Sequence, residues 1–251
     1  MSLGALEFRR SAPQGRKRPS VPIVFVRGMG TWNPRAGSLF CCLTPGQLTR
    51  LREVQTWRSY EPGQPIYYEA TPAFAAFHVE EGLVKIWRMG HAGDQHVLGL
   101  RGPGDVLGYR AVISGGPYPV TADPLERTTV ATIPREVFVG LVRDNPRLAH
   151  RLLEVMAQRT LETEDRLLAR VLDSVIKRTA RVLLELDHEH VRPPNHTPPL
   201  PRKREDLARL IGTTPETLSR TLHSLESRGI LDLSNREIRV RDMESLRHLA
   251  D

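Results

Sequence analysis

Two short amphipathic helical patterns, joined across Gly212, constrain this chain more than any other feature. Each pattern carries a single apolar stripe at helical spacing, which needs a partner surface to pack against. The stripes consist of Leu207, Leu210 and Ile211 in the first pattern and of Leu218, Leu222 and Leu225 in the second. The glycine gives the backbone freedom that a tight turn requires, and Thr214 followed by Pro215 is a typical helix start. The stretch therefore predicts a helix-turn-helix.

The second helix of this pair presents a polar face opposite its leucines. Glu216, Ser219, Arg220 and His223 gather there at helical spacing. Arg can donate two hydrogen bonds to guanine, Glu can accept one from the amino group of cytosine, and Ser reaches bases or phosphates. An ordinary Glu–Arg pair on a solvated helix is the competing interpretation.

The residues after this helix favour DNA recognition. The helix pattern ends at Gly229, and two β-like runs follow at 230–233 and 237–240, with a turn over 234–236 between them. Such a hairpin forms a wing beside a recognition helix. The composite resembles the CRP/FNR superfamily of bacterial transcription regulators, and the resemblance covers residues 40 to 251.

The resemblance assigns roles to three side chains of the recognition helix. Glu216-x-x-Ser219-Arg220 is similar to the FNR-type recognition motif, which implies that these residues read a TTGA-like half-site. Arg220 would contact guanine, Glu216 the paired cytosine, and Ser219 would support them. The branch named for the cyclic-AMP receptor has Arg where this chain has Pro215, so that base contact should be missing.

Charge is distributed unevenly along the chain. The formal net charge is +7, and residues 1–40 hold seven Lys/Arg against one Glu, which leaves most of the excess there. We expect residues 1–39 to be a basic, disordered extension. Residues 202–241 carry nine Lys/Arg and six Asp/Glu, a modest positive bias that suits contact with phosphates. Thr213, Thr214 and Arg236 are candidates for positioning the DNA backbone.

Residues 44–134 show the pattern of a small β-roll. Short β-like runs alternate with Gly, Pro and Asp turn signals, as in a jelly roll. The runs are 66–68, 74–79, 83–88, 96–100 and 128–133. The glycine-rich segment 102–108 resembles the corner of cyclic-nucleotide-binding β-rolls, so we expect a sensor or effector-type domain over residues 40–143.

The expected effector pocket involves Gly108, Tyr109, Arg110 and Thr121. The cyclic-AMP-binding branch places a Glu after the corner glycine and later an Arg that pairs with the cyclic phosphate. This chain has Tyr109 and Val120 at those places, which argues against cyclic AMP. Arg110 could serve another anion, although a solvated Arg at a strand end is the competing interpretation.

Other cofactors find little support in the sequence. Cys41 and Cys42 are the only cysteines, whereas an iron–sulfur cluster usually needs four thiolates, so we expect no cluster. A thiol switch at this pair stays open, as does haem through a single axial His. The His residues show no metal-site spacing, so we expect no metal.

A long helical pattern connects the two parts. Asp144 is a suitable N-cap and Pro146 suits the first turn. Aliphatic residues recur from Leu148 to Ile176, with a gap over 162–166. The pattern fits either a dimerisation helix or a helix packed on the β-roll. The resemblance favours a homodimer whose helix spans 144–170, with the winged helix-turn-helix over 171–251.

The sequence therefore predicts an α+β protein with an N-terminal double-stranded β-helix, a long dimerisation helix and a C-terminal winged helix-turn-helix. It predicts a cytoplasmic, homodimeric, sequence-specific regulator of transcription that binds double-stranded DNA and RNA polymerase, without membrane attachment or enzymatic activity. A ligand, a redox event or protein abundance would bias the dimer helix and so alter the spacing of the recognition helices. Two alternatives remain: a β-roll module whose helix-turn-helix contacts proteins, and a cupin-like metalloenzyme.

Overall fold

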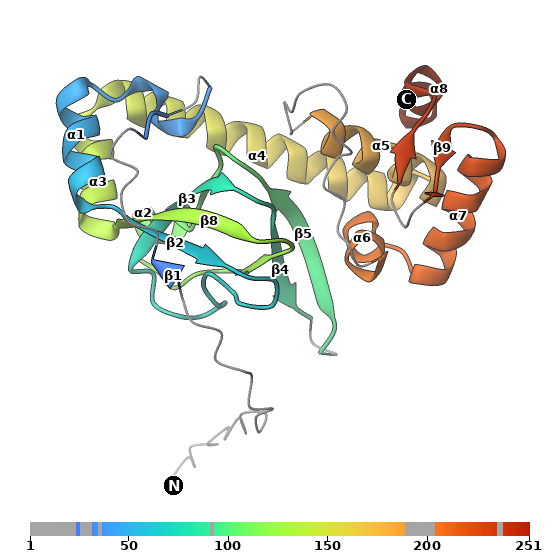
Figure 1. The fold of residues 1–251 in the computed structure, drawn as a ribbon, viewed down its shortest axis with the longest axis horizontal. Coiled ribbons are helices and arrows are strands. Elements are labelled where there is room, and N and C mark those ends of the chain that lie inside the picture. Colours follow the sequence, from blue (N-terminus) through green and yellow to red (C-terminus); the bar gives the residue numbers. More distant parts are fainter. Residues whose placement is uncertain (1–23, 26–31, 35–36, 91–92, 189–203, 235–237) are drawn as a thin grey trace, which may run out of the picture.

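The chain folds into a β-roll, a long helix and a helical C-terminal domain (Figure 1). A computed structural model describes residues 24–25, 32–34, 37–90, 93–188, 204–234 and 238–251. This architecture confirms the predicted α+β class. None of the helices in these described ranges is long and apolar enough to cross a membrane.

Two antiparallel sheets form the β-roll. The larger sheet has the strand order β1-β2-β8-β3-β6, and the smaller one has the order β5-β4-β7. The strands are β1 (Val24–Phe25), β2 (Thr56–Tyr60), β3 (Ala75–Glu81), β4 (Val84–Met89), β5 (Gln95–Arg101), β6 (Val106–Leu107), β7 (Thr121–Pro124) and β8 (Thr128–Pro134). Four of the five predicted runs match β3, β4, β5 and β8. The run 66–68 was wrongly predicted as a strand, since Tyr67 forms only an isolated bridge with Ala122.

Short helices close one end of the roll. They are η1 (Leu39–Cys42), α1 (Pro45–Val54), α2 (Tyr109–Ser114) and α3 (Arg135–Asp144). The start of α1 is fixed by a capping box, in which Thr44 Oγ1 accepts a hydrogen bond from the Gln47 amide and the Gln47 side chain accepts one from the Thr44 amide. The preceding η1 contacts the long helix that begins at Pro146, and α1 contacts β8.

Trp32 belongs to the core of the β-roll. Its indole is only 4% exposed and packs edge-on against Phe40, Trp57 and His78, while its Nε1 donates to Glu80 at 2.9 Å. The predicted boundary of the extension at residue 39 is therefore too late. An aromatic ring that can be buried with its N–H satisfied folds with the domain rather than outside it.

We expect Trp32→Ala to destabilise the β-roll by about 3 kcal/mol, because it removes a buried aromatic ring and leaves a cavity. Denaturant unfolding followed by circular dichroism measures this loss. Phe74→Ala is the control, since Phe74 is 62% exposed and its removal should cost much less. Equal losses in the two variants would contradict the core assignment of Trp32.

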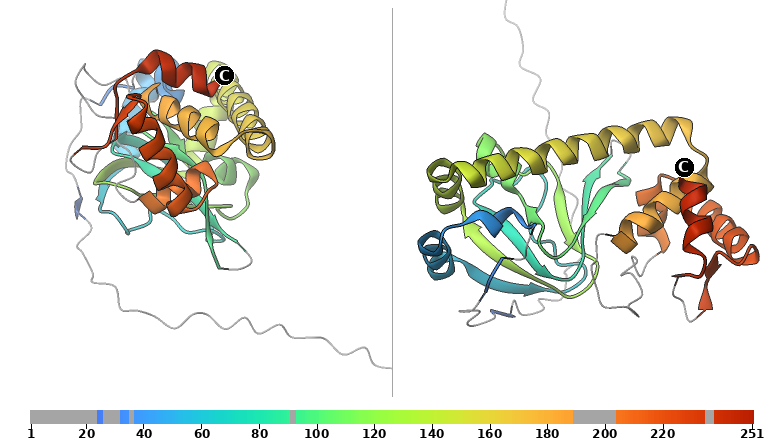
Figure 2. Two further views of the ribbon diagram at one scale, coloured as in Figure 1. Left: turned by 90° about the vertical axis from the view of Figure 1, so that its right-hand side faces the viewer. Right: turned by 90° about the horizontal axis from the view of Figure 1, so that it is seen from above.

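Helix α4 (Pro146–Leu172) runs along the molecule from the β-roll to the C-terminal domain (Figure 2). Its N-cap is Asn145, whose Oδ1 accepts hydrogen bonds from two backbone amides of the first turn. The predicted N-cap Asp144 is wrong by one residue: it ends α3 and pairs with Arg143. The α4 side chains Leu148 and Leu152 are buried against the roll.

The chain bends after α4, at 173–174, and the C-terminal domain follows. Its elements are α5 (Val175–His188), α6 (Arg204–Ile211), α7 (Pro215–Ser227), β9 (Leu231–Asp232), β10 (Arg239–Val240) and α8 (Met243–Ala250). We expected the first helix of this domain to begin at Val171, but Val171 and Leu172 are the last residues of α4. Asp173 is non-helical, and its amide caps the end of α4 through the Ala169 carbonyl.

Candidate nucleic-acid interface

Helix α7 is built as the second helix of a helix-turn-helix. The turn needs Gly212, whose φ of +76° disfavours side chains. Thr214 Oγ1 accepts from the Thr217 amide at 3.2 Å, and Pro215 fills the first helical position, as predicted. The stripe of Leu218, Leu222 and Leu225 is fully buried. The opposite face of α7 is therefore fixed toward solvent.

The exposed face of α7 carries the predicted base-contacting residues. Glu216 and Arg220 are exposed, and Ser219 is half-buried beside them. Arg220 Nη2 donates to Thr217 Oγ1 at 3.2 Å, and Arg204 Nη1 lies 3.4 Å from Ser219 Oγ. These contacts hold the side chains in place without covering them.

The Glu216 carboxyl is suited to accept a hydrogen bond. Its pKa lies below the ordinary value, because its own backbone amide and the Thr214 hydroxyl donate to it and because Arg220 adds a nearby positive charge. A carboxylate that stays ionised at neutral pH can only accept, which matches the amino group of a cytosine.

The residues predicted to contact the DNA backbone lie around the start of α7. Thr214 is exposed and Thr213 is half-buried, with its amide bound to the Ala208 carbonyl at 2.9 Å. Arg236 lies outside the described residues. The structure therefore brings the two threonines close to Glu216, beside the exposed face.

Glu226 joins the recognition helix to the wing, a role that no sequence pattern signalled. Its Oε1 accepts from the Leu233 amide at 3.2 Å, and its Oε2 lies 3.2 Å from Nδ1 of His223. One carboxylate thus contacts both the α7 face and the chain leaving β9. It fixes where the wing lies relative to α7.

Arg178 holds the turn of the helix-turn-helix. From α5 its guanidinium donates to the carbonyls of Ile211 at 3.1 Å and Gly212 at 3.3 Å, and also to Asp173 at 2.7 Å. Carbonyls at a helix end need such partners. Because Asp173 lies at the bend after α4, Arg178 connects the end of the long helix to the turn before α7.

An ion pair at the wing makes its stability depend on pH. Arg241 Nη2 lies 2.7 Å from Asp232 Oδ2, and this pairing, together with hydrogen bonds from Ser234, lowers the pKa of Asp232 from 3.8 to about 2. Because the folded-state pKa is depressed, the pair stabilises the wing fully above about pH 4, and the contribution is lost as the pH falls toward 2.

We therefore expect Asp232→Asn to lower the melting temperature at pH 7, with the difference from the wild type shrinking at pH 3. Thermal unfolding by circular dichroism at pH 7, 5 and 3 measures it. Glu244→Gln, an exposed carboxylate on α8, is the matched control and should show no such trend. A constant difference at all three pH values would rule out this role for the Asp232 charge.

An open cavity of about 1620 Å³ lies between the β-roll, α4 and the C-terminal domain. Three of the four predicted effector-pocket residues, Gly108, Tyr109 and Arg110, line it. Thr121 does not: it is buried and its hydroxyl accepts from the Glu69 amide at 3.0 Å. Val120, which directly precedes β7, lines the cavity instead.

Packing accounts for the corner glycine without a ligand. Gly108 has a φ of +73°, and an added Cβ would lie 2.8 Å from the Tyr118 ring. The Tyr118 ring stacks on Tyr67 with centroids 4.1 Å apart, and its hydroxyl donates to the Ala75 carbonyl at 2.7 Å. Burial raises the pKa of Tyr67 far above its usual range, so the cavity wall is neutral there.

Sulfur and imidazole groups lie away from this cavity. Among the described residues that line it there is neither a Cys nor a His. Cys41 is exposed, and Cys42 is half-buried with a pKa raised by burial and by its neighbour Cys41. No group of three or more metal-binding side chains occurs within the described ranges.

Comparisons with known proteins match both parts of the chain. A cyclic nucleotide-binding domain model matches residues 57–145, and a Crp-like helix-turn-helix domain model matches residues 177–249. The cyclic AMP receptor protein of Thermus thermophilus is 29% identical over 216 residues, which cover 86% of this chain and 98% of that relative. The nitrogen fixation regulation protein FixK of Bradyrhizobium diazoefficiens is 23% identical over 218 residues, which cover 86% and 91%. The structure of FixK2 from Bradyrhizobium japonicum superposes with a TM-score of 0.72 at 29% identity, covering 79% of this chain and 98% of that one.

A β-roll joined by a long helix to a winged helix-turn-helix with an exposed polar face defines a DNA-binding transcription regulator with a sensing domain. Both family models match in this order, and the relatives are regulators of transcription rather than enzymes. The chain belongs to the CRP/FNR superfamily, as the sequence motifs indicated.

Proposed function

We propose that the protein acts as a cytoplasmic homodimer on a two-fold TTGA/TCAA-like DNA site, where it also contacts RNA polymerase. Glu216, Ser219 and Arg220 read each half-site, while Thr213 and Thr214 contact phosphates. The observation that carries the proposal is the exposed face of α7. On this face Thr217 accepts a hydrogen bond from Arg220, and the Thr214 cap hydrogen-bonds the neighbouring Glu216 carboxylate. One helix spans only a few base pairs, so a two-fold dimer reading two half-sites gives useful specificity.

The residues of the β-roll cavity support a signal other than cyclic AMP. Tyr109 and Val120 line it where the cyclic-AMP branch has its Glu and Arg, and Thr121 hydrogen-bonds the Glu69 amide instead. Its described lining residues include no His or Cys to bind haem iron, and one chain supplies two thiols where an iron–sulfur cluster usually takes four. The controlling signal in this proposal is therefore another small molecule, a change at the thiols or the abundance of the protein.

Selection of duplexes from a random pool tests the proposal. The purified, untagged protein is used at near-physiological salt and without added ligand, and the bound duplexes are sequenced. Enrichment of a two-fold TTGA/TCAA-like site supports the assignment and shows that no ligand is obligatory. Enrichment of an unrelated site would contradict it, and a folded dimer that enriches no site would mean either that an effector or redox state is missing or that the FNR-type resemblance misleads. Addition of cyclic AMP should leave the enrichment unchanged.

A further inference from the structure

The helix-turn-helix domain packs against the β-roll of its own chain. Leu83 and Leu100 of the roll are buried in the same apolar cluster as Leu207 and Ile211 of α6. Figure 1 shows α6 beside strand β5, with α7 on the far side of α6. The contact therefore uses the first helix of the motif and leaves the exposed face of α7 free.

A buried ion pair crosses this boundary. Lys85 Nζ of β4 lies 2.7 Å from Asp206 Oδ1 in the first turn of α6, and 3.7 Å from Asp123 Oδ2 of β7. The Lys85 and Asp206 side chains are only 10% and 7% exposed. The desolvation of two charges largely offsets their attraction, so such a pair adds little net stability. The pair does fix the orientation of α6 on the β-roll, because either charge would be costly to bury without its partner.

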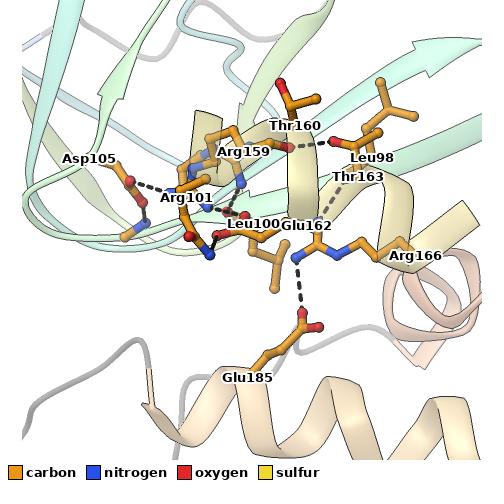
Figure 3. A network of polar contacts seen from close by, with 12 residues as sticks. Leu98, Leu100, Arg101, Asp105, Arg159, Thr160, Glu162, Thr163, Arg166 and Glu185 are labelled. Carbon is orange, nitrogen blue, oxygen red and sulfur yellow. Dashed lines mark hydrogen bonds and ion pairs between the residues drawn. The ribbon is translucent and has the colours of Figure 1, made fainter. Parts of the chain in front are cut away.

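A second polar contact limits rotation of the C-terminal domain about the Lys85–Asp206 pair. Arg166 of α4 donates through Nη1 to the Leu98 carbonyl of β5 at 3.1 Å and through Nη2 to Glu185 of α5 at 2.9 Å (Figure 3). Arg159, two turns earlier, pairs with Asp105 at 2.6 Å and holds α4 on the roll. The C-terminal domain is thus held at two separated points, on α6 and on α5.

We infer that Lys85 is a positioning residue for DNA binding: its pair with Asp206 holds the helix-turn-helix domain on the β-roll in an orientation that fits the DNA site. The inference rests on the proposed dimer function. A domain held in place loses less orientational freedom on binding than one that turns about the bend at 173–174. The Lys85–Asp206 pair restricts the orientation of the domain by itself and requires no ligand in the cavity for this.

Half-site spacing gives a readout that loss of stability alone would not move. A destabilised fold weakens binding to every site in parallel, whereas freely turning domains lose the preference for one spacing. The test compares Lys85→Met with Lys85→Met/Asp206→Asn, which leaves no charged Asp206 unpaired. Arg88→Met is the matched control. Arg88 lies on β4, as Lys85 does, but its ion-pair partner, Glu69 at 2.9 Å, belongs to the β-roll itself.

Dissociation constants are measured at one salt concentration for the selected site and for versions with the spacer changed by one or two base pairs. We expect both Lys85 variants to bind the selected site about tenfold more weakly and to lose most of their spacing preference, while the control keeps both. Small-angle X-ray scattering of the free proteins should show a larger radius of gyration for the variants alone.

Two results would overturn the inference: wild-type spacing preference in the folded double variant, or tighter binding once the pair is removed. If the wild type selects no site at all, that result bears on the proposed function and not on this inference. In that case scattering still decides the role of the pair, since an unchanged radius of gyration in both variants refutes it.

Discussion

Arg220→Ala is expected to lose sequence preference while it keeps salt-sensitive, non-specific DNA binding. Arg220 is exposed on α7, its Nη2 donates to Thr217 Oγ1, and in the proposed function its guanidinium donates two hydrogen bonds to a guanine. Loss of such a contact costs on the order of 1–3 kcal/mol of discrimination, or roughly 5- to 150-fold. Competition binding between the selected site and a scrambled duplex measures this difference.

Arg228→Ala is the matched control for this experiment. It removes the same charge from the end of α7, at the C-cap, so it should lower affinity for all duplexes slightly and equally. The base at the Arg220 position should become degenerate only in the Arg220 variant. If Arg220→Ala selects the wild-type site with undiminished preference, the recognition-helix assignment is wrong.

The helix-turn-helix could be predicted because its determinants are local. The cap at Thr214, the turn at Gly212 and the leucine stripe lie within a few residues of one another, and each has its expected conformation. Predicted helix starts were wrong where two adjacent residues could both act as the N-cap or where a cap lay in a segment with a β-like pattern. Asn145 rather than Asp144 caps α4, and the capping box of Thr44 and Gln47 begins a helix inside a segment whose pattern predicts β-structure.

The contacts between domains could not be predicted in this way. Lys85 and Asp206 are 121 residues apart, and neither stands in a pattern that marks its partner. The same holds for Trp32, whose burial depends on Phe40, Trp57 and His78 surrounding it. No local sequence pattern distinguishes such residues, because their roles depend on partners that only the folded topology brings close.

One of the two interpretations that the sequence of helix α4 left open, packing on the β-roll, is confirmed near the start of the helix, while dimerisation through its other end stays a prediction. Near its start, Leu148 and Leu152 are buried against the β-roll. Toward its end, a stripe of aliphatic side chains faces solvent in the single chain. These residues are Leu161, Leu167, Leu168, Val171 and Leu172, each at least 55% exposed. The last four of these residues form an apolar patch at helical spacing, which predicts an interface, and the resemblance makes a second copy of the helix the expected partner.

Leu168→Glu should therefore produce a monomer that binds its DNA site about 100-fold more weakly or worse. The added charge would be buried against the partner helix, and a monomer loses the gain from engaging two linked half-sites. Sedimentation equilibrium measures the oligomeric state, and titration of the selected duplex measures the affinity. Gln158→Glu adds the same charge to an exposed position of α4 outside the stripe and should stay dimeric. A dimeric Leu168→Glu variant with wild-type affinity would mean that the two copies pair through another surface.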